Sequence, residues 1–240
     1  YSGEAFAVPK GLEARVEFWV DIYSKYTTHQ GVMHDSHNPE IVFAELDFTA
    51  AQSQKVRRQV IKEKKKEISA LLLRLDSVQD PSQLTAAELD VYRKYDGISE
   101  PRKFKNAAVK GRVRFQLGQK DRFIQGVYYS GRYLKQMEEI FRNDGLPIEL
   151  TRLPFVESSF NIYARSKVGA SGVWQFMRRT ARNYMHVDSL VDERNDPLRA
   201  TRASARLLKS NFQLLGNWPL ALTAYNHGPT GVLKLTQKLS

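Results

Sequence analysis

Apolar residues recur at intervals of three and four positions along most of the chain, a spacing typical of amphipathic helices. Residues 11–26 and 53–75 carry the clearest stripes of this kind. Between them the spacing changes: alternate positions are apolar in residues 40–48, and turn formers at 36–39 separate them from residues 27–35. We therefore predict a mainly α-helical protein whose N-terminal part contains one small β-hairpin.

Capping residues predict where the other helices begin and end. Thr85 and Glu88 have the spacing of a capping box, in which each side chain satisfies a backbone amide of the other residue. Asp196 followed by Pro197 provides an N-cap and a first-turn proline. The further helices that we predict are 103–117, 119–128, 130–144 ended by Gly145, Pro147 to Glu157, 180–184, Pro197 to Leu215 ended by Gly216 and Asn217, and Pro219 to Asn226.

The composition is that of a folded protein, with 42% hydrophobic residues in a chain of 240, enough for one large or two small domains. No apolar run approaches the ~20 residues that span a bilayer. The sequence from Tyr1 does not open like a signal peptide, which leaves secretion open. The chain has no cysteine, which excludes disulfides and thiolate chemistry. We interpret His34 and His37 as turn residues, and we expect no metal and no cofactor.

The net charge of +11 favours an acidic partner, and both nucleic acid and the bacterial envelope fit that description. Residues 145–240 hold 13 Lys and Arg against 6 Asp and Glu, so this part carries about +7 of the excess. The sequence patterns of RNA-recognition, KH, zinc-finger and helix-turn-helix modules are absent from the 240 residues. We therefore do not expect nucleic-acid binding.

Among the acids of this basic part, Glu157 has the most apolar neighbours in sequence. Phe155 and Val156 precede it and Phe160 follows, and apolar surroundings raise the pKa of a carboxyl as a general acid requires. The other acids have simpler explanations as caps, first-turn residues or partners of nearby charges: Glu149, Asp188, Asp192, Glu193 and Asp196. The plain alternative is that Glu157 ends a helix and is exposed.

Three motifs in order decide between these interpretations of Glu157. They are Glu157-Ser158, then Gly172-Val173-Trp174-Gln175-Phe176, then Ala224-Tyr225-Asn226-His227-Gly228. Their order and spacing resemble the lytic transglycosylases, both the soluble Slt type and the membrane-bound type D enzymes. Those enzymes cleave bacterial peptidoglycan on a goose-lysozyme-like fold. The resemblance covers roughly residues 130–232.

The resemblance implies a lysozyme-like helical catalytic domain over residues 129–240, with residues 1–128 as a helical extension packed on it. The family has a later motif with no counterpart before Ser240, so we expect a domain that is incomplete at its C-terminal end relative to the family. His227 stands where relatives often have alanine.

The resemblance also implies that Glu157 is the acid and base of the reaction. One carboxylate would protonate the oxygen between N-acetylmuramic acid and N-acetylglucosamine and then deprotonate the C6 hydroxyl, which closes a 1,6-anhydro ring. The substrate-binding residues carried over are Ser158, Ser166, Gly172, Gln175, Tyr225 and Asn226. Both serines could instead satisfy loop amides, and Trp174 could stack on a sugar or lie in the core.

Two alternatives stay open at this point. A hydrolytic muramidase on the same fold would need a second carboxylate to activate water, and a catalytically silent wall-binding protein would need none. In each case we expect peptidoglycan strands as the partner. We expect a periplasmic or secreted protein, with outer-membrane association, peripheral or through a lipid anchor, left open.

Overall fold

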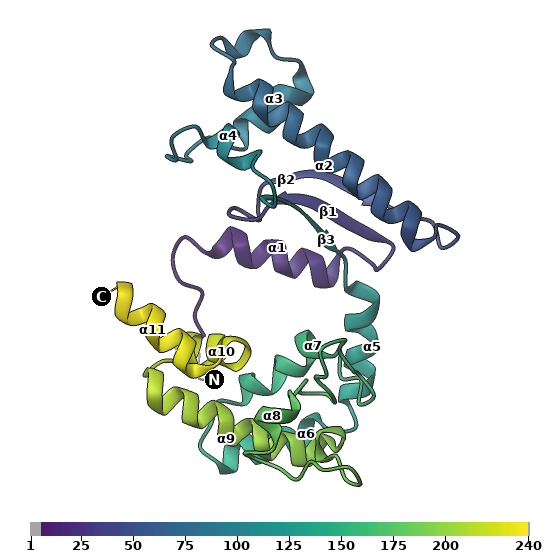
Figure 1. Ribbon diagram of the computed structural model, residues 1–240, viewed down its shortest axis with the longest axis vertical. Coiled ribbons are helices and arrows are strands. Elements are labelled where there is room, and N and C mark those ends of the chain that lie inside the picture. The colour runs from purple at the N-terminus through teal and green to yellow at the C-terminus, as the bar shows by residue number, and fades with distance from the viewer. Residues whose placement is uncertain (1–5, 240) are drawn as a thin grey trace. The chain divides into compact units, whose positions relative to one another are not determined.

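The N-terminal part of the chain folds around a three-stranded antiparallel sheet in the order β2-β1-β3 (Figure 1). The computed structural model describes residues 6–239 and divides them into a sheet unit, residues 8–122, and a helical unit, residues 6–7 with 123–239. The elements of the sheet unit are α1 (Glu13–Ser24), β1 (Gln30–Asp35), β2 (Val42–Asp47), α2 (Gln54–Asp76), η1 (Pro81–Gln83), α3 (Ala86–Arg93), α4 (Lys103–Ala107) and β3 (Val113–Leu117).

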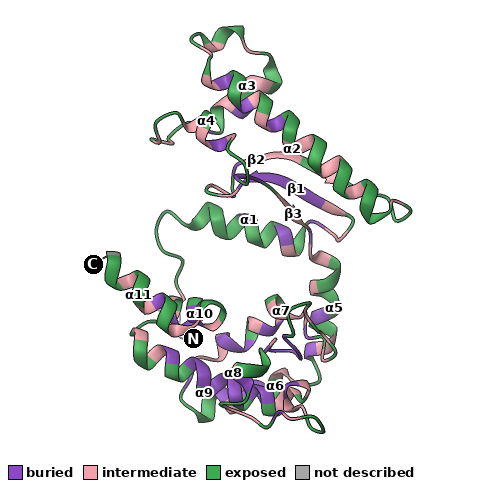
Figure 2. Cartoon of the chain, in the orientation of Figure 1, coloured by how far each residue is buried: buried purple, intermediate pink, exposed green. Residues whose placement is uncertain are grey.

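Strand β1 is buried along most of its length because helices cover both of its faces (Figure 2). Side chains of a strand point alternately to opposite faces. Val32 accordingly joins Phe18 and Ile22 of α1 in one core cluster, while Met33 joins Leu72 of α2 in another. The predicted hairpin is confirmed as β1 and β2, and the predicted capping box of α3 is present at Thr85 and Glu88.

The prediction of one helix over residues 103–117 is wrong. The helix ends at Ala107, Gly111 has a φ of +93°, and residues 113–117 form β3, which pairs with β1. Val113, Phe115 and Leu117 alternate with polar residues, a strand pattern that the helical interpretation overlooked. His34 is also not a turn residue: it lies in β1 and is 7% exposed, and burial lowers the pKa of its ring.

A buried ion pair links Asp35, at the end of β1, to Arg112, the residue before β3. Asp35 of β1 accepts a hydrogen bond of 2.9 Å from the Arg112 guanidinium and one of 2.9 Å from the Tyr95 hydroxyl. Arg112 also forms a two-pronged pair with Glu100. Burial alone would raise the pKa of Asp35, but the hydrogen bonds from Arg112, the His37 amide and Tyr95 outweigh it and lower that pKa.

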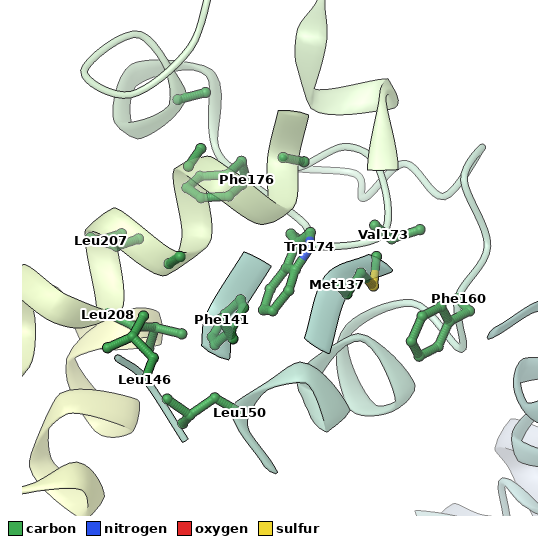
Figure 3. Close-up of a cluster of buried hydrophobic side chains, with 14 of the residues drawn as sticks. Met137, Phe141, Leu146, Leu150, Phe160, Val173, Trp174, Phe176, Leu207 and Leu208 are labelled. Carbon is green, nitrogen blue, oxygen red and sulfur yellow. The ribbon is translucent and has the colours of Figure 1, made fainter. Parts of the chain in front are cut away.

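The helical unit is built around α9 (Pro197–Leu215), which is buried along one side (Figure 2). Most of its buried residues are small. Its other elements are α5 (Lys120–Ser130, which begins in the sheet unit), α6 (Leu134–Asn143), η2 (Ile148–Arg152), α7 (Leu153–Glu157), α8 (Arg178–Ala181), η3 (Glu193–Asn195), α10 (Trp218–His227) and α11 (Pro229–Leu239). The side chains of Phe141, Trp174 and Leu208 meet in its core (Figure 3).

The predicted helix ends of this unit are largely confirmed. Asp196 accepts hydrogen bonds from the amides of Leu198 and Arg199, and Gly216 ends α9 with a φ of +78°. The segment after Pro147 differs from the single helix that we predict, because a 3-10 turn ends at Arg152 and a separate helix, with Pro154 in its first turn, begins at Leu153. The mainly α-helical fold with a small β element is confirmed.

The domain boundary predicted at residues 128 and 129, and the packing of residues 1–128 on the rest, stay predictions. No helix within residues 6–239 combines the length and the apolar character that a bilayer span requires.

We expect Arg112→Met to destabilise the sheet unit by about 3–5 kcal/mol, because it leaves Asp35 buried without its cation. Urea denaturation of the whole chain followed by circular dichroism measures this. Arg114→Met is the matched control, since Arg114 lies two residues further on, in β3, and is exposed; it should change stability by less than about 0.5 kcal/mol. Equal losses in the two variants would contradict a role of the ion pair in stability.

Candidate active site

Glu157 is the last residue of α7, and the chain turns sharply directly after it. Ser159 and Phe160 both have left-handed backbones, with φ of 52° and 55°, a conformation that disfavours side chains by about 1–2 kcal/mol per residue. Phe160 is nevertheless 1% exposed, and its ring packs edge-on against Phe155. Burial of this ring therefore stabilises the turn that positions Glu157.

The Ser158 hydroxyl holds the end of α7 to the glycine-containing segment 172–176. Its Oγ donates a hydrogen bond of 2.8 Å to the carbonyl of Val173. Ser158 is not among the residues that line the pocket around Glu157. The contact observed for this serine is thus one that positions the backbone.

Gly172 lies against the backbone of residue 194, with a φ of +76°. A Cβ at this position would overlap the carbonyl oxygen of Arg194. Arg194 is itself 7% exposed; it pairs with Asp192 and donates to the carbonyls of Gly169 and Phe176. The buried Arg194 side chain therefore fixes both ends of the segment 169–176 through hydrogen bonds to its carbonyls.

Trp174 lies in the core, which is one of the two positions that the sequence allowed for it. Its side chain is fully buried, and its ring stacks on Phe141 with 5.8 Å between centroids (Figure 3). The indole N–H donates a hydrogen bond of 2.9 Å to Thr201 of α9. Stacking on a sugar is therefore not a role that this tryptophan can take in the observed conformation.

Tyr225 and Asn226 of α10 approach Glu157 from the other side. The Tyr225 hydroxyl donates a hydrogen bond of 2.6 Å to the carbonyl of Trp174. The Asn226 amide donates to Glu157 Oε1 across 3.5 Å, the outer limit for such a bond. Two segments nearly 70 residues apart in sequence thus meet at one carboxylate.

These residues surround an open pocket of about 280 Å³. Five of the seven predicted site residues line it: Glu157, Ser166, Gln175, Tyr225 and Asn226. The Ser166 hydroxyl accepts a hydrogen bond from the Ala170 amide, and the Gln175 amide donates to the carbonyls of Ala164 and Gly172. Ser158 and Gly172 lie outside the lining.

Glu157 is the one acid among the lining residues, all of which belong to the described part of the chain. Burial raises the pKa of Glu157, and the hydrogen bond from Asn226 opposes this only in part. The pKa of Tyr225 is raised as well, first by burial and then by the charge of Glu157. The pocket therefore favours a carboxyl group that keeps its proton to a higher pH than usual.

The family comparison agrees with this geometry. Residues 135–238 match the family model described as "Transglycosylase SLT domain". This part of the chain is an SLT transglycosylase domain.

Curated relatives share the same region of the SLT domain. The chain is 37% identical over 91 residues to "Membrane-bound lytic murein transglycosylase D" of Escherichia coli (strain K12), an alignment that covers 37% of this chain and 20% of that protein. It is 35% identical over 91 residues to "Putative tributyltin chloride resistance protein" of Alteromonas sp. (strain M-1), which covers 37% of this chain and 44% of that protein. The chain thus spans less than half the length of these relatives.

Several lining residues of this pocket are not among the seven predicted site residues. They are Val168, Ala170, Phe176, Met177, Thr180 and Leu207. Met177 directly follows the Gln175-Phe176 motif and Thr180 lies three residues further on, so the continuation of the motif could have indicated them. Leu207 lies on α9 and no local signal marks it. His227, whose position departs from the family pattern, is exposed and does not line the pocket.

We expect Gly172→Ala to destabilise the SLT domain by about 2–4 kcal/mol, through backbone strain and overlap with the Arg194 carbonyl. Gly169→Ala is the matched control. Gly169 lies in the same loop with a φ of +92°, but its Cβ would meet no atom within 4 Å. It should lose only the strain, about 1–2 kcal/mol. Thermal denaturation compares the two, and equal losses would contradict the close approach at Gly172.

We expect Glu157→Gln to stabilise the SLT domain at neutral pH. Because the pKa of Glu157 is raised above its ordinary 4.5 in the fold, the unfolded chain releases this proton first. The folded state therefore loses stability as the pH rises through that range, and the uncharged glutamine avoids the loss. The gain should be absent below about pH 4. Urea denaturation at both pH values measures it, with the exposed Glu139→Gln as control; a gain equal at both would contradict the raised pKa.

Proposed function

We propose that this chain cleaves the bond between N-acetylmuramic acid and N-acetylglucosamine in peptidoglycan and leaves 1,6-anhydromuramic ends. The observation that carries the proposal is a single carboxyl with a raised pKa in a pocket that no other acid lines. Membership of the SLT family and the murein transglycosylase among the relatives support the same reaction.

In the first step, protonated Glu157 donates its proton to the glycosidic oxygen while the bond from that oxygen to muramic C1 breaks. N-acetylglucosamine leaves as the free alcohol, and an oxocarbenium-like centre remains at C1. The raised pKa supports this step, because a larger fraction of Glu157 holds its proton near neutral pH.

In the second step, the Glu157 carboxylate takes the proton of the muramic C6 hydroxyl, and O6 bonds to C1. The enzyme returns to its protonated state and no water is consumed. Most glycoside hydrolases use a second carboxylate to activate water or to form a covalent intermediate. An internal hydroxyl removes that need, which matches a pocket with one acid.

The other proposed site residues divide by position. Ser166, Gln175, Tyr225 and Asn226 line the pocket, and we assign them to substrate binding, with Asn226 orienting Glu157. Hydroxyl and amide groups suit the hydroxyls and acetamido groups of the sugars. We assign Ser158 and Gly172 to positioning the backbone that carries these groups.

The setting of the reaction follows from the proposed substrate. We propose an envelope protein, periplasmic or secreted, whose basic charge of about +7 over residues 145–240 draws it to the acidic wall. The alternative of a hydrolytic muramidase has no second carboxylate in the pocket lining to support it.

The test is digestion of purified peptidoglycan by the unaltered chain and by Glu157→Gln, with the product ends identified by mass spectrometry. We expect products lighter by one water than hydrolytic ones, and a loss of rate of about 10²–10⁴-fold or more in the variant. Glu139→Gln, at an exposed position of α6, should cleave normally. Reducing ends would establish a muramidase instead, and no cleavage would favour a silent wall-binding protein.

A further inference from the structure

A second pocket of the SLT domain lies beside the chain segment that leaves Glu157. It measures about 190 Å³ and is formed by α5, the turn between α5 and α6, and residues 160–163. We call it the tyrosine pocket after the residues that carry the argument: Gln125, Tyr129, Arg132, Tyr133, Asn161 and Tyr163. It shares no lining residue with the pocket of Glu157. Only three peptide units separate Glu157 from Phe160, a chain length of about 11 Å at most.

Arg132 gives this pocket a positive charge without a partner. Within residues 6–239 its guanidinium forms no ion pair and no hydrogen bond, and no acid lines the pocket. Arg152 and Arg194 of the same unit, in contrast, are paired with Glu138 and Asp192. A guanidinium left open in this way suits a carboxylate, which it can bind through two parallel hydrogen bonds.

The amide side chains of the tyrosine pocket offer one acceptor and one donor in addition. Gln125 donates its amide nitrogen to the Tyr129 hydroxyl, and Asn161 accepts from the Tyr163 amide through its oxygen. The oxygen of Gln125 and the nitrogen of Asn161 have no partner within the described residues. Together they match the donor and acceptor of a peptide group.

The tyrosine rings supply flat apolar walls. Tyr163 is 82% exposed, so packing within the domain accounts for little of its ring. Tyrosine combines a large apolar face with a polar tip and loses little conformational freedom on binding. Three such rings around one guanidinium fit a ligand with an aliphatic or amide body that ends in a carboxylate.

We propose that the tyrosine pocket binds a carboxylate on the side arm of muramic acid, in the strand whose sugars lie at Glu157. This rests on the proposed function. The carboxylate has two sources in peptidoglycan: the peptide attached to the lactyl group, or the lactyl group itself where no peptide is attached. Both present a carboxylate, and the attached peptide also presents amides to Gln125 and Asn161.

The test is calorimetric titration of the whole chain carrying Glu157→Gln, so that no probe is cut. The probes are a disaccharide-peptide fragment of peptidoglycan, N-acetylmuramic acid and N-acetylglucosamine. We expect the first to bind most tightly and the last, which has no carboxylate, to bind least. In that background Arg132→Gln should weaken the first by about 10–100-fold, the value of a charged hydrogen-bonded pair.

Arg142→Gln is the matched control, because Arg142 is exposed ten residues further on and does not line the pocket. It should leave the affinity within about twofold. Tyr163→Ala, at an exposed position, should weaken binding by about 5–10-fold through the lost ring. Equal affinities for N-acetylmuramic acid and the peptide fragment, both sensitive to Arg132→Gln, would support the pocket and show that it accepts the carboxylate from either source.

The proposal is overturned if Arg132→Gln and Arg142→Gln bind alike, or if no probe binds. Cleavage separates this result from the proposed function. With Glu157 intact, Arg142→Gln and the unaltered chain should cut strands at equal rates, because Arg142 lines neither pocket. If the unaltered chain cuts no strand but binds the peptide fragment through Arg132, the catalytic proposal fails and the tyrosine pocket stands.

Discussion

The candidate site depends on how Trp174 is anchored in the core. Its ring stacks on Phe141 and its N–H donates a hydrogen bond to Thr201, so the core fixes the position of the backbone at this residue. The carbonyl of Trp174 then accepts the Tyr225 hydroxyl, and the preceding carbonyl of Val173 accepts the Ser158 hydroxyl. The helix that carries Glu157 and the helix that carries Asn226 are thereby aligned on one pair of peptide groups.

The same packing accounts for the electrostatics of the pocket. Arg194 is buried behind the loop and is neutralised by Asp192, while Glu193 pairs with Arg199. Asp196 caps α9. These acids are held in contacts away from the pocket, which leaves Glu157 as the acid in its lining. Because burial is the larger effect on the pKa of Glu157, the core that forms the fold also keeps this group protonated to a higher pH.

Local sequence predicted those parts of the molecule that depend on local physics. The N-cap at Asp196, the left-handed glycine at 216 and the capping box at Thr85 follow from backbone amides and carbonyls within a few residues. The prediction missed strand β3. Its partner β1 lies about 80 residues earlier, so only the alternation of apolar and polar residues could have indicated the strand. Leu207 was missed for the same reason: a long helix brings it to the pocket, and nothing beside it in sequence shows this.

The turn at Ser159 and Phe160 links the two pockets of the SLT domain. Glycine would relieve the left-handed strain at position 160 but would remove a buried ring, and such a ring contributes about 1.5–3 kcal/mol. Burial thus offsets strain of about 1–2 kcal/mol. Because the buried Phe160 holds this turn in place, it determines both the direction of α7 before the turn and the direction of residues 161–163 after it. A shift that moves Glu157 would therefore also move Asn161 and Tyr163, so one packed phenylalanine fixes the spacing between the acid and the tyrosine pocket.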